Sequence, residues 1–370
     1  MPLITLEEKK GTYIESFDGI RGIGVICVLA AHCFPFINIF QIGWVAMDYF
    51  FVLSGFLITG ILVDSVEKKN YLKNYLGRRV LRVFPVYYLF LILMFLIIPN
   101  IFPALFDQYG YLQSKQIWFW LYAQNWLFSF EGFPNKLYLS HLWSMAVEEQ
   151  FYLFWPFIIW FLRGKKLIYF CVLAIPFAFF FRLYGGNWGL VFPFQYVNTL
   201  SRMDSLLIGA LIFLLLRYHK NLLEVLALPV FIITVLGLMA CIYILKATYF
   251  AKLVPAYSLV DFMAGASLVF CISRTSNWIK RFFSIPFFVF VGKYSYGTYM
   301  VHYPLYLVLY ERYGVHASTP IKIIIGIFSI LLSFGLAVLS FHFFETPFLK
   351  LKKYFVNSSS PSLKTEITNG

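Results

Sequence analysis

Ten long apolar runs, separated by short polar and often basic stretches, make up most of the chain. A transmembrane helix needs about 20 mainly apolar residues, and each run is long enough to form one. We therefore predict an all-α, polytopic membrane protein. The predicted spans are residues 17–37, 42–63, 83–103, 142–162, 167–184, 197–217, 224–245, 254–273, 285–309 and 321–345.

The composition supports this interpretation and excludes an ordinary soluble protein. Hydrophobic residues make up 61% of the 370-residue chain and charged residues 13%, against about 45–50% and about 25% in soluble domains. Lys9 and Lys10 precede the first run, but that run contains Asp18 and Arg21, which predicts a retained helix rather than a cleaved leader. The five cysteines stand singly, without the paired spacing of a metal or disulfide framework, so we expect them only to pack and predict no metal.

The distribution of basic residues predicts the orientation of the chain in the membrane. If the N-terminus is cytoplasmic, 20 of the 30 Lys and Arg residues fall in inner segments and 8 in outer segments. Basic residues gather in cytoplasmic loops for topological reasons, so the net charge of +13 does not call for a nucleic-acid partner. We expect a multi-pass protein of the cell (inner) membrane with both termini in the cytoplasm.

Two segments differ from this pattern of spans and short loops. The longest connection, residues 104–141, is rich in aromatic residues and lies outside in the predicted topology, where we expect it to pack as an interfacial or re-entrant cover over a site. Residues 356–370 are polar and predict a disordered cytoplasmic tail. The transmembrane domain is then residues 1–355.

Charged and polar side chains inside the predicted spans point to function, because each one costs about 2.5–3.5 kcal/mol to insert. Arg21 and His32 are eleven residues apart on the first helix, so they share one face about 16 Å apart. Arg21 lies near the cytoplasmic end and His32 in the outer half. A ligand with a phosphate at one end and a reactive group at the other could contact both. Taken alone, without Arg21, His32 is better explained as a buried histidine hydrogen-bonded to a neighbouring helix.

A second group of cations, Arg78, Arg79 and Arg82, precedes Pro85 at the inner end of the third span. The spacing puts Arg78 and Arg82 on one helical face, and guanidinium groups bind phosphate oxygens in a bidentate manner. The alternative is an anchor for anionic lipid headgroups. Together with Arg21, the three arginines favour a cytoplasmic phosphate clamp.

The outer half of the predicted bundle contains several ionisable side chains. The fourth span begins at Trp143 and continues with Glu148 and Glu149, which cannot both face lipid. The same depth contains Asp48, Arg202, Asp204 and His302. An imidazole beside carboxylates in a water-accessible cavity suits general base catalysis at a hydroxyl. The structural alternative is that Arg202 is simply neutralised by Asp204 or Glu148.

Six segments in order carry a resemblance to a known family. They are Phe17–Arg21 with His32, Asp48–Ile58, Arg78–Pro85, Leu142–Tyr152, Tyr294–Tyr299 with His302, and Glu345–Pro347. In these segments the chain resembles the acyltransferase-3 family of membrane O-acyltransferases, which modify bacterial surface polysaccharides and some antibiotics. The resemblance implies that the first-helix arginine and histidine serve the activity, that the arginine pair meets the phosphates of an acyl-CoA donor, and that acetyl-CoA is the expected co-substrate.

A mechanism follows as a hypothesis. Arg21, Arg78, Arg79 and Arg82 hold the donor phosphates, and His32 acts as general base on the acceptor hydroxyl or takes the acyl group itself as a covalent intermediate. We expect a carboxylate, Glu148 first and Asp48 second, to orient the imidazole.

The acceptor is expected to be an envelope saccharide or glycolipid, such as lipopolysaccharide. Trp143 could stack on its rings, with Glu149, Arg202, Asp204 and His302 as further contacts. The rival hypothesis is a transporter or flippase for a lipid-linked saccharide, since intramembrane charges also mark substrate pathways. A transporter more often shows two related halves, and no such repeat is visible in the sequence.

Overall fold

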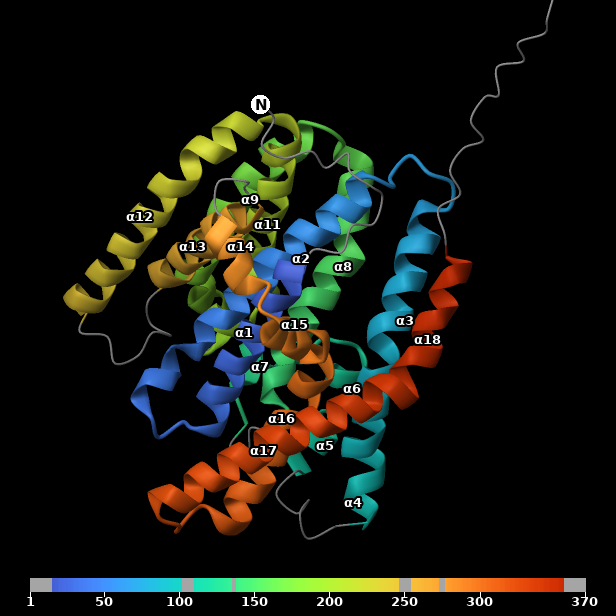
Figure 1. Ribbon diagram of the computed structural model, residues 1–370, viewed down its shortest axis with the longest axis vertical. Helices are drawn as coiled ribbons and strands as arrows, with labels where there is room; N and C mark the ends of the chain where they lie inside the picture. The colour runs from blue at the N-terminus through green and yellow to red at the C-terminus, as the bar shows by residue number, and fades with distance from the viewer. Residues whose placement is uncertain (1–14, 102–109, 135–137, 246–253, 273–276, 356–370) are drawn as a thin grey trace, which may run out of the picture.

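The structure, a computed structural model, describes residues 15–101, 110–134, 138–245, 254–272 and 277–355 (Figure 1). Within these ranges it contains helices and no strands. Eight helical segments of the described chain are long and apolar enough to cross a membrane. The prediction of an all-α, polytopic membrane protein is therefore confirmed, whereas the cytoplasmic placement of both termini stays a prediction. The predicted tail, residues 356–370, lies outside the described residues.

A long helix lies at each predicted span in the described part of the chain. These helices are α1 (Glu15–Cys33), α2 (Ala46–Val63), α3 (Tyr71–Ile92), α8 (Trp143–Leu162), α9 (Lys166–Tyr184), α11 (Thr199–Tyr218), α12 (Lys220–Leu245), α13 (Val254–Ile272), α16 (Ser295–Tyr313) and α17 (Thr319–Leu339). Helices α8 and α16 are not among these eight segments. Their polar residues, Glu148 and Glu149 on α8 and His302 on α16, belong to the site described below.

Shorter elements connect the long helices. They are η1 (Asn38–Val45), η2 (Leu93–Ile97), α4 (Ile98–Ile101), α5 (Gly110–Ser114), α6 (Gln116–Trp120), α7 (Gln124–Glu131), η4 (Ser140–Leu142), η5 (Gly185–Trp188), α10 (Phe194–Val197), α14 (Asn277–Phe283), α15 (Pro286–Lys293), η7 (Ser340–Glu345), α18 (Thr346–Lys350) and η8 (Leu351–Tyr354). Two of them, η2 and η7, are π-helical turns that continue α3 and α17.

The structure corrects the bounds of two predicted spans. The third was expected to begin at residue 83, but α3 begins at Tyr71. Arg79 in this added stretch has a partner inside the protein: its guanidinium carbon lies 3.6 Å from the centre of the Tyr152 ring. The ninth was expected as one helix, but it is broken at Tyr294, where φ is −102° and ψ is 6°. The Tyr294 carbonyl accepts hydrogen bonds from the amide and hydroxyl of Thr298, at 3.1 and 3.0 Å, and so begins α16.

Part of the predicted outer connection packs into the protein. Gln124 and Asn125 of α7 are fully buried. The side chain of Gln150 on α8 donates a hydrogen bond of 2.9 Å to the Asn125 side chain. Phe133 lines a cavity described below. This part of the connection therefore covers one end of α8, in agreement with the predicted cover.

Glycines allow two helix pairs to approach backbone to backbone. A Cβ atom at Gly209 of α11 would lie 1.9 Å from the carbonyl oxygen of Val52 on α2. At Gly292 of α15 it would lie 1.8 Å from the carbonyl oxygen of Asp18 on α1. Small residues serve this role between membrane helices, whose association depends on close packing. Helices α1 and α2, which carry much of the site, are thus fixed by close contacts to α15 and α11.

The arrangement of the helices leaves room for a site beside α1 and α2. Figure 1 shows α12, in yellow, at one edge of the bundle and α3 with α18 at the opposite edge, while α17 runs beside α16. The side chains between α3 and the helices α1, α2, α8, α15 and α16 enclose the larger of the two cavities described below.

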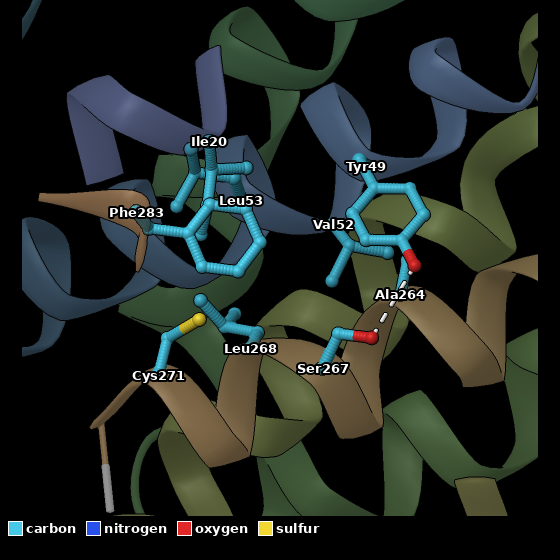
Figure 2. Close-up of a pocket in the computed structure, with 9 residues that line it drawn as sticks. All are labelled: Ile20, Tyr49, Val52, Leu53, Ala264, Ser267, Leu268, Cys271 and Phe283. Carbon is cyan, nitrogen blue, oxygen red and sulfur yellow. Dashed lines mark hydrogen bonds between the residues drawn. The ribbon is translucent and has the colours of Figure 1, made fainter. Parts of the chain in front are cut away.

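A small third cavity between α1, α2, α13 and α14 is a packing gap (Figure 2). Its volume is about 10 Å³, enough for about one water. Ile20, Leu53 and Phe283 line one side of it, and the hydroxyl groups of Tyr49 and Ser267 lie 3.3 Å apart in a hydrogen bond across another. With its polar atoms already paired and so little volume, this cavity is no substrate site.

Candidate active site

Two larger cavities adjoin each other within the bundle. One has a volume of about 570 Å³ and contains Arg21 and Arg82; the other has a volume of about 310 Å³ and contains His32. We call them the inner cavity and the outer cavity after the predicted topology. Two residues, Met47 of α2 and Tyr299 of α16, line both. The predicted pairing of Arg21 and His32 at two depths of α1 therefore corresponds to two adjoining spaces.

The arginines of α3 differ in their relation to the inner cavity. Arg79 and Arg82 line it, three residues apart, whereas Arg78 is exposed and does not line it. The face predicted to present Arg78 with Arg82 is therefore represented in the cavity by Arg82 alone. Arg79 is held against Tyr152 of α8, so Arg82 is the freer of the two guanidinium groups.

Two further cations reach the inner cavity from the opposite wall. Arg21 of α1 pairs with Asp18 at 2.8 Å and is partly exposed, with 23% of its side-chain surface accessible. Lys293, the last residue of α15, also lines the cavity. Cations on both α1 and α3 face one space, which is the geometry that a phosphate clamp requires.

The carboxylates of α8 lie in the inner cavity and not beside His32. Glu148 accepts a hydrogen bond of 2.7 Å from the Ser54 hydroxyl of α2. Both Glu148 and Glu149 line the inner cavity next to Arg79. Glu148 was our first choice to orient His32, and the structure gives it other partners, because α8 projects this side chain into the space lined by arginine.

Three imidazoles gather at the outer cavity instead. Nδ1 of His32 lies 2.8 Å from Nε2 of His302, and their rings stack with centroids 5.2 Å apart. The His141 ring lies 5.3 Å from that of His302, edge to face. His302 is fully buried and His141 is 3% exposed. Side chains from α1, η4 and α16 thus form one cluster.

When both rings are neutral, the hydrogen bonds determine which nitrogen of His32 and which nitrogen of His302 carries the proton. Nδ1 of His302 lies 2.7 Å from the carbonyl oxygen of Tyr299, which can only accept, so this nitrogen carries the proton. Nε2 of His302 then has the free electron pair and accepts from Nδ1–H of His32. Nε2 of His32 is therefore the nitrogen of this ring with a free electron pair. His302 binds the Nδ1–H of His32, which is the role that we had assigned to a carboxylate.

His141 was not among the predicted site residues. Its Nε2 lies 3.1 Å from the carbonyl oxygen of Met300, and its Nδ1 has no hydrogen-bond partner among the described residues. His141 lies one residue outside the predicted fourth span, where ionisable side chains are common, so nothing in the sequence singled it out.

Aromatic side chains complete the outer cavity. Trp143, which we predicted to stack on an acceptor, lines it together with Trp44, Tyr196, Tyr257 and Tyr303. The Tyr303 ring lies 4.5 Å from that of His32. Flat rings around a histidine suit the apolar faces of sugars.

The remaining predicted residues form a buried ionic network behind this wall. Asp48, our second choice to orient His32, is bound to Arg202 instead. Asp204 forms a bidentate pair with Arg182, at 2.9 and 2.5 Å. All four side chains are buried and none lines either cavity. Arg202 lies 5.0 Å from the centre of the Tyr257 ring, so the network supports the aromatic wall from behind.

Comparison with known proteins places the chain among acyltransferases. A family model described as "Acyltransferase domain" matches residues 14–341. No solved structure matches the chain.

Several curated proteins are similar to this chain. A peptidoglycan O-acetyltransferase of Listeria monocytogenes is 28% identical over 94% of the chain and 60% of its own length. A putative O-acetyltransferase of Staphylococcus aureus strain COL is 27% identical over 92% of the chain and 58% of its own length. An O-acetyltransferase of Staphylococcus aureus strain NCTC 8325 is 28% identical over 91% of the chain and 57% of its own length. The chain therefore spans about three fifths of the length of the curated relatives that it matches.

Proposed function

We propose that this chain, which belongs to the acyltransferase family matched over residues 14–341, transfers an acyl group from cytoplasmic acyl-CoA to a hydroxyl of a cell-envelope saccharide. Acetyl is the expected group, since the similar curated proteins carry the name O-acetyltransferase. The observation that carries the proposal is the pair of adjoining cavities, one lined by cations and the other by imidazoles and aromatic rings.

The inner cavity is the proposed donor site. The 3′-phosphate and pyrophosphate of coenzyme A are polyanionic, and Arg21, Arg82 and Lys293 offer them cationic groups from two sides of one space. Charge-assisted hydrogen bonds to such oxygens are about twice as strong as neutral ones. Arg79 contributes positive charge while remaining stacked on Tyr152. The thioester end of the donor then points toward Met47 and Tyr299.

In the outer cavity, His32 is the proposed general base. His302 holds the Nδ1–H of His32, so the free electron pair on Nε2 of His32 can accept the proton of the acceptor hydroxyl. The resulting positive charge is shared through the same hydrogen bond with a neutral imidazole. A positioned base of this kind contributes about 10²- to 10⁴-fold to the rate.

The proposed transfer is balanced in atoms and electrons. The acceptor oxygen attacks the thioester carbon as His32 takes its proton, a C–O bond forms, and the C–S bond breaks. The electron pair leaves with sulfur, and His32 returns the proton to the coenzyme A thiolate. The products are the ester and free coenzyme A, and no metal or redox partner is needed for this balance.

The acceptor is proposed to be a saccharide because of the outer lining. Trp44, Trp143 and Tyr303 present flat apolar faces close to His32. The name of the Listeria relative specifies peptidoglycan, which makes an amino-sugar polymer the first acceptor to test.

The test is transfer of radiolabel from acetyl-CoA to envelope glycans in membranes that contain wild-type protein, His32→Ala or Arg82→Ala at equal levels. We expect wild type to label the glycans and His32→Ala to lose this labelling. Arg82→Ala should label them weakly at low donor concentration and recover its labelling at higher donor concentration. Equal labelling by all three proteins and by empty membranes would contradict the enzyme assignment and favour a transporter of a lipid-linked saccharide.

A further inference from the structure

The boundary between the two cavities is made by few side chains. Among the described residues, Met47 and Tyr299 alone line both cavities. Met47 belongs to the first turn of α2 and is 7% exposed. A group that moved from the arginines to His32 would pass beside the thioether of Met47 on α2 and the phenol ring of Tyr299 on α16.

Tyr299 is held firmly in this position. Its hydroxyl donates to the carbonyl oxygen of His141 at 2.6 Å and lies 2.7 Å from the Ser144 hydroxyl, which is then the donor to it. Its own carbonyl oxygen accepts from Nδ1 of His302 at 2.7 Å. One residue thus joins the boundary to two of the three histidines, and its ring cannot swing away without breaking those bonds.

Met47 is the adaptable half of the boundary. Its side chain is unbranched, with three rotatable bonds, so it can fill or vacate a passage at small cost. No hydrogen bond holds it, because the thioether is at most a weak acceptor. The passage thus has one fixed wall and one yielding wall, and its width depends on the volume of the residue at position 47.

From this geometry we infer that Met47 and Tyr299 determine the length of the acyl group that the protein transfers. The inference rests on the proposed function. The thioester carbon must reach His32 while the pantetheine arm remains behind the boundary, so the rest of the acyl chain must fit beside Met47 and Tyr299 or enter the outer cavity. The acceptor occupies that same 310 Å³. A short acyl group fits beside Met47 and Tyr299 and leaves room for the acceptor. Each added methylene needs space that these two side chains or the acceptor already occupy.

The experiment compares acetyl-, propionyl-, butyryl- and hexanoyl-CoA as donors for purified wild-type protein and Met47→Ala in lipid nanodiscs. We expect the ratio of kcat/KM for butyryl-CoA to that for acetyl-CoA to rise about 10-fold or more in Met47→Ala, because one methylene changes discrimination by about 10-fold or more in a tight apolar site. Met47→Val removes less volume and should raise this ratio by an intermediate amount. It replaces Met47→Ala in the test if that variant does not fold. Tyr299→Phe keeps the ring but removes the hydroxyl group whose hydrogen bonds hold it, so we expect a smaller rise in the same ratio.

Met145→Ala is the matched control. Met145 is a buried methionine that lines the inner cavity but not the outer cavity. Its truncation should leave the butyryl-to-acetyl ratio within about twofold of wild type. If Met47→Ala and Met47→Val both transfer acetyl with an unchanged ratio, or if Met145→Ala raises the ratio as much, the inference about the boundary is overturned and the proposed function stands. If wild type accepts no acyl-CoA, the proposed function fails and this inference fails with it.

Discussion

The inner and outer cavities differ in the kind of polarity that lines them. The inner cavity contains four cations and three carboxylates within reach of the protein surface, whereas no Lys, Arg, Asp or Glu lines the outer one in the described part of the chain. Fixed charges suit a polyanionic ligand that must be bound and released. Imidazoles that are hydrogen-bonded to one another suit the movement of a proton. Under the proposed function, the donor binds in one space and the chemistry at the acceptor takes place in the other, and the two spaces adjoin at Met47 and Tyr299.

The largest effect is expected at His32. His32→Ala should lower kcat by about 10²- to 10⁴-fold, because it removes the base, and should leave the KM for acetyl-CoA nearly unchanged, because the donor cations are intact. Steady-state kinetics on reconstituted protein measures both quantities. A rise in KM as large as the loss in kcat would contradict the separation of the two cavities.

The next effect tests the donor side. Arg82→Ala should raise the KM for acetyl-CoA about 10- to 100-fold, since a hydrogen bond to a charged group contributes about 1.5–3 kcal/mol. Arg78→Ala is the matched comparison, because Arg78 lies on the same helix but outside the cavity, and its effect should be much smaller. Added salt should weaken donor binding by wild type more than by Arg82→Ala, since exposed charges are screened. Equal effects of the two substitutions would assign the arginines to lipid anchoring.

A smaller effect is expected at the positioning residue of the outer cavity. His302→Ala removes the acceptor of the His32 Nδ1–H bond, so we expect a fall in kcat of about 10-fold with the KM for donor unchanged. The pH dependence of kcat should also shift, because His32 loses the group that shares its positive charge. An unchanged pH profile with a lowered melting temperature would reduce His302 to a packing role.

The smallest effect lies outside both cavities. Hydrogen bonds from Lys115 and Tyr111 hold the pKa of Glu131 in α7 below its ordinary value. A carboxyl group with a lowered pKa in the folded state stabilises the protein above its unfolded pKa and loses that contribution as pH falls through the folded value. Glu131→Gln should therefore lower the melting temperature by less than about 2 °C at pH 7, and the difference should vanish below about pH 4. A larger shift would show that this surface pair holds the outer cover in place.

The sequence predicted the long helices well because hydropathy reports which segments can face lipid. It failed at the start of α3, which begins before the predicted span, and at Tyr294, where one expected helix is two. Arg21 and His32 were identified because intramembrane polar groups are rare, and Trp143 because its ring could stack on a sugar. The structure places all three beside a cavity. Their partners depend on which helices adjoin, which spacing along one helix does not reveal.

The pairings show the same limit in more detail. We expected a carboxylate beside His32, and the structure places His302 there and turns Glu148 toward the inner cavity. The pair Arg202–Asp48 joins residues 154 positions apart. No local periodicity encodes such a contact, because it arises only when α2 and α11 cross at their glycines.

We propose that donor and acceptor are bound in two spaces that open toward opposite sides of the membrane. The most direct measurement supplies labelled acetyl-CoA, which does not cross membranes, to inverted vesicles and to right-side-out vesicles from one preparation of cells. The account predicts label in endogenous glycan only with inverted vesicles, and none there with His32→Ala. Equal labelling of right-side-out vesicles, or labelling that survives His32→Ala, would contradict it.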